Sequence, residues 1–188
     1  MKKRFCLAGI ALLLLLLAVC GWKGYCAYYP VEEDLENLPH YVNHALNRGN
    51  KNQFDYQIRL YDSAAVGNER YVLVEIDRQL GFVRLERGLN DRYRVAGIGY
   101  GGGNFREAVV ESEGEKALLF AGRNAVWGIA EAEFSLDRKM YRLEIPVGER
   151  FLLKADLPSE TRESHIDLES VRFYAADGKD ITENIPWN

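Results

Sequence analysis

Residues 54–60, with the sequence FDYQIRL, mark the point where this chain takes up a β-strand pattern. Apolar or aromatic side chains alternate there with polar ones. Because successive side chains of a strand point to opposite faces, the alternation predicts a strand that is buried on one face.

Further strand-like runs follow this one along the chain, separated by residues that favour turns, such as Gly67 with Asn68 and Asp177 with Gly178. Short strands at a spacing of about 8–12 residues, with no helical pattern between them, predict a mainly β fold. We expect an antiparallel β-sandwich or a barrel-like domain over residues 54–185. The further runs are 70–76, 81–85, 92–96, 105–111, 116–121, 129–136, 140–145, 150–154 and 171–175. The predicted core residues are Val72, Val74, Ile76, Phe134, Leu136, Tyr141, Leu143 and Ile145.

Residues 30–49 have a helical pattern, because apolar side chains recur there at spacings of three and four. Acidic residues 32–34 suit the positive end of a helix dipole, and Gly49 is a typical terminator. The pattern predicts a short amphipathic helix, with a kink at Pro39 or a division into two helices there. The apolar stripe consists of Leu35, Leu38, Val42, Ala45 and Leu46.

Residues 5–22 carry no charge and directly follow Lys2, Lys3 and Arg4. As a helix rising about 1.5 Å per residue, this segment nearly spans the hydrocarbon core of a bilayer. Basic residues stay on the cytoplasmic side, so the remainder of the chain is expected outside the cytoplasm. We therefore predict a signal-anchor or transmembrane segment with its juxtamembrane linker over residues 1–29, and an extracytoplasmic domain over residues 30–188.

Two other fates of this segment remain open. A basic start and a leucine-rich centre are also typical of a cleaved secretory signal, for which residues 24–26 are an imperfect site. Residues 17–21, LAVCG, resemble a bacterial lipobox in which Cys20 is lipidated, although Val19 departs from the small residue usual before the cysteine. The protein is then a lipoprotein or is secreted, and in each case the domain is exported.

Composition restricts the partners of the exported part. Without the four basic residues of the anchor region, 20 basic and 28 acidic residues remain, a net charge of −8. No basic stripe is left for a nucleic acid. The cysteines are Cys6, Cys20 and Cys26, so we expect a domain without disulfides that depends on its apolar core.

A literal G-x-G-x-x-G occurs at Gly97, Gly99 and Gly102. A dinucleotide site needs a helix immediately afterwards, whereas residues 105–111 are strand-like. We interpret the glycines as a flexible or left-handed connection between strands and expect no cofactor.

Metal-assisted or carboxylate catalysis has little support in the sequence. His40 and His44 have the spacing of two ligands on one helical face, but Tyr41 stands where H-E-x-x-H has its glutamate. We expect surface histidines and no metal. Residues 111, 113 and 115 are glutamates at alternate positions, which indicates a solvated sheet face rather than an acid–base pair.

The segment 122–128, GRNAVWG, is the candidate ligand-binding loop, because loops on a rigid sheet commonly carry binding groups. Its candidate residues are Arg123, Asn124 and Trp127, which are suited to an anion or a peptide. We favour a structural role for this segment, in which Trp127 caps the core, because buried aromatic side chains dominate protein cores; the three residues are thus weak candidates for binding.

Residues 171–182, which include the last predicted strand and the turn after it, have the sequence VRFYAADGKDIT. This phrase resembles the last strands of small, uncharacterised, membrane-anchored extracytoplasmic β-domain proteins of Gram-positive bacteria. The resemblance implies an all-β exported domain, and it supplies no catalytic residues.

Together these features predict a membrane-tethered extracytoplasmic binding or regulatory module without catalysis, whose partner is a protein, a peptide or a cell-wall component. An extracytoplasmic hydrolytic or metal-assisted enzyme that uses His40 and His44 is one alternative. A structural accessory subunit of a membrane complex is another.

Overall fold

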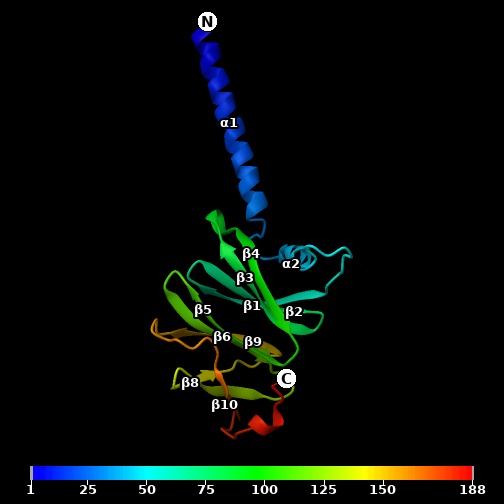
Figure 1. The fold of residues 1–188 in the computed structure, drawn as a ribbon, viewed down its shortest axis with the longest axis vertical. Coiled ribbons are helices and arrows are strands. Elements are labelled where there is room, and N and C mark those ends of the chain that lie inside the picture. Colours follow the sequence, from blue (N-terminus) through cyan, green and yellow to red (C-terminus); the bar gives the residue numbers. More distant parts are fainter. Residues whose placement is uncertain (1, 188) are drawn as a thin grey trace.

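The computed structural model describes residues 2–187, with side chains from Leu12 onward. Helix α1 (Lys2–Tyr28) projects from a β domain, and helix α2 (Leu38–Leu46) lies beside that domain near the end of α1 (Figure 1). The strands are β1 (Ile58–Val66), β2 (Glu69–Ile76), β3 (Gln79–Arg87), β4 (Tyr93–Gly101), β5 (Phe105–Ser112), β6 (Glu115–Arg123), β7 (Ile129–Leu136), β8 (Lys139–Glu144), β9 (Arg150–Leu157) and β10 (Asp167–Ala175).

The strands form three antiparallel sheets, which are stacked below α1 in Figure 1. The first sheet has the order β1-β2-β3-β4, the middle sheet β5-β6-β9 and the outer sheet β10-β7-β8. Strand β1 lies against β9 and β3 lies against β5, so the first sheet covers one face of the middle sheet. The outer sheet covers the other face.

Strand β6 is buried on both faces, and it explains why the sheets stack in three layers. Leu118 and Phe120 enter the core shared with the outer sheet, whereas Ala117, Leu119 and Ala121 enter the core shared with the first sheet. Because side chains alternate along a strand, an apolar run of this length supplies two cores at once.

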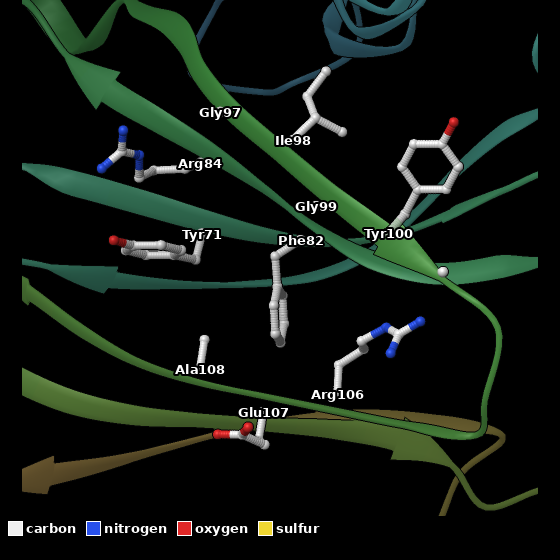
Figure 2. Close-up of a pocket in the computed structure, with 11 residues that line it drawn as sticks. Tyr71, Phe82, Arg84, Gly97, Ile98, Gly99, Tyr100, Arg106, Glu107 and Ala108 are labelled. Atoms are coloured by element: carbon white, nitrogen blue, oxygen red, sulfur yellow. The ribbon is translucent and has the colours of Figure 1, made fainter. Parts of the chain in front are cut away.

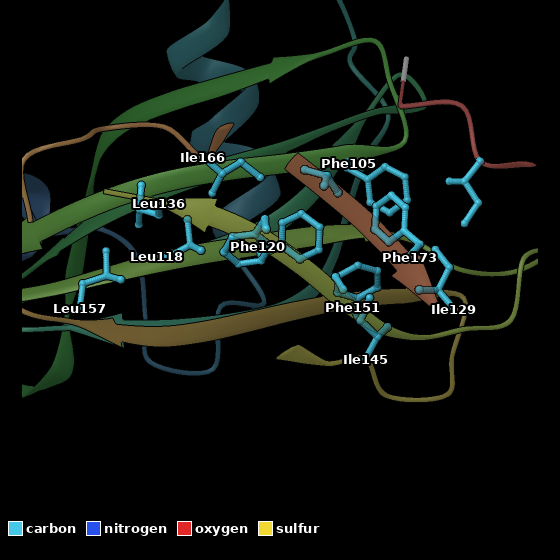
Figure 3. Packing of buried hydrophobic residues seen from close by; sticks show 14 residues of the cluster. Phe105, Leu118, Phe120, Ile129, Leu136, Ile145, Phe151, Leu157, Ile166 and Phe173 are labelled. Atoms are coloured by element: carbon cyan, nitrogen blue, oxygen red, sulfur yellow. The ribbon is translucent and has the colours of Figure 1, made fainter. Parts of the chain in front are cut away.

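The core between the middle and outer sheets is rich in aromatic rings (Figure 3). Phe105 and Phe173 stack with their ring centroids 4.7 Å apart, and Phe120 lies 5.7 Å from Phe134. Full burial of each such side chain contributes about 1.5–3 kcal/mol to the free energy of unfolding. The disulfide-free domain is therefore held together by apolar packing.

The predicted strands are confirmed in number and order, and so is a mainly β fold of packed antiparallel sheets; the barrel-like alternative and the start of the first strand are not. The sheets stay open across the described residues, so the fold is a stack of sheets and not a barrel. The first strand begins at Ile58, because residues 54–57 run outside the sheet.

The predicted helix over residues 30–49 is shorter in the structure. Pro39 lies in the first turn of α2, where its missing N–H leaves no helical bond unmade, so it starts the helix and does not kink it. Before it, Leu35 has a φ of 64° and Val31 pairs with Tyr93 of β4. Leu38 and Val42 of α2 are buried against the first sheet.

The last turn of α1 is attached to the β domain by polar contacts. The Tyr25 hydroxyl donates to the Leu89 carbonyl at 2.6 Å, and Arg92 Nε donates to the Tyr29 carbonyl at 2.8 Å. Residues 5–11 of the predicted anchor have side chains outside the described part. Among the described residues, no helix has the length and hydrophobicity needed to cross a membrane.

Candidate functional site

A groove of about 700 Å³ lies between the first and middle sheets, where the edge strand β4 faces the edge strand β5 (Figure 2). Its floor is backbone of β4, its walls come from β2, β3 and β5, and an arginine stands at each end. The side chains that define it are Tyr71, Phe82, Arg84, Arg106 and Ala108.

Alternate residues of β4 are glycines, and this creates the groove. Gly97 and Gly99 lie on the face towards the middle sheet, whereas Ile98 packs into the core beneath α2. No heavy atom of another residue beyond its chain neighbours lies within 4 Å of the position that a Cβ of Gly99 would occupy. The backbone is thus open to a ligand at Gly99.

The walls of the groove are apolar with one buried phenol. Phe82 pairs with Gly99 across the strands, and Ala108 of β5 lies opposite. The Tyr71 hydroxyl donates to Glu69, and burial together with this bond raises the pKa of Tyr71 above its usual range. Tyr71 therefore remains a neutral phenol.

The two arginines differ in their partners. Arg84 approaches Glu69 at 3.4 Å and is half-exposed. Arg106 donates to the carbonyls of Leu80 at 3.0 Å and Gly102 at 2.6 Å, and it has no carboxylate partner in the described structure. Burial, and secondarily the charge of Arg123, lowers the pKa of Arg106, yet an arginine keeps its charge at neutral pH.

The outer edge of β4 is open beside the groove. Among the described residues, only Tyr93, near its start, pairs with another residue on that side, through two backbone bonds with Val31 of 2.9 and 3.0 Å. Residues 95–101 have no ladder partner on this edge within the described chain. They are also the longest run without charge or proline on the edge strands of the three sheets. Proteins usually protect such edges with charged residues or proline.

Glu107 lines the groove through its backbone, because its side chain points away from the cavity (Figure 2). Its Oε1 lies 2.8 Å from Nδ1 of His165, on the side of the outer sheet. The groove thus has an arginine at each end, and no carboxylate among its lining residues points into it.

The loop residues singled out in the sequence do not form one site. Arg123 is the last residue of β6, and its Nη2 lies 2.7 Å from Oε1 of Glu75. Asn124 is buried and bonds both the N–H and the carbonyl of Ile129, at 2.7 and 2.8 Å. Trp127 stacks on Phe105 with centroids 6.0 Å apart, which agrees with the favoured structural role as a core cap.

The structure also locates the predicted glycine pattern and the alternate glutamates. The first glycines of the G-x-G-x-x-G pattern belong to β4, so the prediction of a flexible connection is wrong for Gly97 and Gly99; the connection is confined to residues 102–104. Glu111 lies in β5, whereas Glu113 is in the turn with a φ of 51°, so the alternate glutamates do not share one strand.

His40 and His44 lie on α2, and the described residues contain no group of three or more potential metal ligands. Cys20 is an exposed free thiol on α1. Comparisons with protein-family models, with curated proteins and with solved structures give no match for this chain.

Proposed function

We propose that this protein is a membrane-tethered extracytoplasmic binding module that captures an extended peptide segment along β4. The observation that carries the proposal is the open, uncharged edge of residues 95–101 next to a groove with a glycine floor. A peptide strand beside such an edge gains main-chain hydrogen bonds, and side-chain pockets then select its sequence.

The chain itself supports this mode of binding. Val31 already occupies the first position of the β4 edge through two backbone bonds to Tyr93. A peptide that continues along residues 95–101 extends this pairing. One face of the added strand meets the groove, where glycines leave room for its side chains.

The lining of the groove indicates the composition of the peptide. Phe82, Tyr71 and Ala108 favour an apolar side chain in the centre. Arg106 lacks a carboxylate partner among the described residues, and an acidic side chain of the ligand supplies one. The proposed ligand is an extended segment in which apolar and acidic residues alternate.

The tether and the location outside the cytoplasm are part of the proposal. The charge-free run of residues 5–22 behind three basic residues supports both. On α1, Leu12 to Leu17 are exposed at 53–61%, as a lipid-facing surface requires. Lipidation at Cys20 and cleavage of the segment are the alternative fates. An enzyme that uses His40 and His44, and a structural accessory subunit, are the alternative functions.

The test is a substitution that fills the groove. In Gly99→Val, the added side chain enters open space in a strand position where valine is favoured, so the fold is retained. We expect the detergent-solubilised full chain to bind short synthetic peptides with alternating apolar and acidic residues. Gly99→Val should weaken that binding about tenfold or more, measured by fluorescence anisotropy.

The matched control is Gly148→Val, in the loop before β9, where the nearest atom to an added Cβ is an ordinary contact at 3.5 Å. This variant should bind like the unmodified chain, and peptides with lysine in place of the acidic residues should bind weakly. Equal affinity of Gly99→Val and the unmodified chain at equal melting temperature contradicts the proposal.

A further inference from the structure

A second cavity, of about 550 Å³, lies where the end of α1 meets α2 and β4. It is separate from the groove, since it is on the α2 side of the first sheet. Four of its lining residues are basic or titrate to a cation, and none is acidic. These residues are His40, His44, Arg48 and Arg94.

Three of the four basic groups come from α2 and the turn that follows it. His40 and His44 are four residues apart on one face of α2, and Arg48 lies in the turn just beyond the end of the helix, where it lines the same cavity. None of these three side chains makes an ion pair or a side-chain hydrogen bond with the described part of the protein. They are therefore free to bind an anion.

Arg94 forms the opposite wall. Its guanidinium bonds Glu86 and the Tyr28 hydroxyl, while its Nε is buried without a hydrogen-bond partner. The guanidinium also lies over the Tyr28 ring, 4.9 Å from the centroid. A buried N–H that lacks a partner carries a desolvation cost, which an acceptor on a ligand removes.

The cavity lies at a defined height above the proposed membrane segment. Ala27, the first residue that lines the cavity, is five residues beyond Trp22, and a helix rises about 1.5 Å per residue, so the cavity begins about 7.5 Å past the hydrocarbon boundary. The headgroup layer is about 5–8 Å thick on each side of the bilayer. The cavity thus opens at the outer margin of the lipid headgroups.

We propose that this cavity binds the phosphate group of an anionic membrane lipid. The inference rests on the membrane tether of the proposed function but not on peptide binding. Arginine binds phosphate oxygens through paired N–H donors, and each of the two histidine rings adds an N–H donor. A free phosphate shares this chemistry, so the test separates the two sources.

The experiment is a calorimetric titration of the full chain in uncharged detergent at neutral pH. The probes are dihexanoyl phosphatidylglycerol, dihexanoyl phosphatidylcholine and inorganic phosphate. We expect saturable binding of the phosphatidylglycerol and weaker binding of the other two. Arg48→Gln should weaken phosphatidylglycerol binding about tenfold, and His44→Gln should weaken it in the same direction.

Arg162→Gln is the matched control, because it removes one exposed positive charge near the outer sheet, away from the cavity. It should leave lipid binding unchanged, and Arg48→Gln should leave peptide binding at the groove unchanged. The proposal is overturned if no lipid binds saturably, if both arginine variants lose the same affinity, or if inorganic phosphate binds as tightly as the anionic lipid.

Discussion

At Glu75, one buried carboxylate connects the first sheet with the middle sheet. Its Oε2 accepts the Tyr61 hydroxyl at 2.7 Å, and its Oε1 accepts Arg123 at 2.7 Å and Arg150 at 3.4 Å. Burial alone raises the pKa of Glu75, but the Tyr61 bond and then the two guanidiniums outweigh it, so the pKa lies below its usual range. The carboxylate is thus charged and fully partnered in the folded protein.

Replacing Glu75 by alanine should destabilise the fold. Arg123 and Arg150 would remain mostly buried without their carboxylate, and breaking such a pair costs about 3–5 kcal/mol of the free energy of unfolding. Urea denaturation at neutral pH measures this loss. Glu131→Ala is the control, because its pair with Arg142 is exposed to solvent and should contribute little to the free energy of unfolding.

The pH dependence of the Glu75 effect has a definite sign. A carboxyl whose pKa is lower in the folded state stabilises the fold above its unfolded pKa, and this contribution is lost as the pH falls through the folded pKa. The difference between the unmodified chain and Glu75→Ala should therefore be constant near neutrality and shrink below about pH 4. A difference independent of pH down to acid unfolding would contradict the role of the charge.

At the scale of elements, the strands were predictable because local alternation determines them. In β2 and in β6, alternate side chains enter two different cores, so both faces of each strand are apolar. The sequence of each strand is therefore a continuous apolar run bounded by turns. The glycines of β4 conceal that strand, since glycine is depleted in strands. Its pairing with β3, the preceding strand, also contains a register shift at Arg84 and Leu85, which local patterns do not show.

The candidate site could not be predicted for the same physical reason. The groove combines β2, β3, β4 and β5, and its existence depends on how two sheets stack. The three candidate loop residues are close in sequence but have different roles in the structure. Arg123 forms an ion pair with Glu75, Asn124 hydrogen-bonds the backbone of Ile129, and Trp127 packs on the core. The alternation of glycines at 97, 99 and 101 is the available signal, but glycines are equally typical of a flexible connection between strands.

At the scale of the whole molecule, α1 and the β domain meet at residues 25–30, and that arrangement sets where both proposed sites lie relative to the proposed membrane segment. Tyr25 and Arg92 contacts hold the helix end on the domain. If residues 5–22 lie in a bilayer, the basic cavity faces the lipid headgroups and the β4 edge stands farther out with the domain. The outer sheet is then the layer most distant from the membrane (Figure 1).

The tether predicts the effect of a charge within the apolar run. Leu14→Arg places a charge near the centre of residues 5–22, at a cost of about 2.5–3.5 kcal/mol for membrane insertion. We expect less protein in the membrane fraction after carbonate extraction. Leu168→Arg, an exposed leucine of β10, is the control and should fractionate like the unmodified chain. Full retention of Leu14→Arg would contradict the tether, and intact mass distinguishes lipidation at Cys20 from an uncleaved segment.

Amide hydrogen exchange of the full chain, with and without a saturating acidic–apolar peptide, tests the central claim that a ligand strand pairs with β4. The claim predicts that exchange at residues 95–101 slows about tenfold or more, because outward N–H groups gain partners. Binding that leaves residues 95–101 unprotected, with protection instead over residues 124–128, would contradict it.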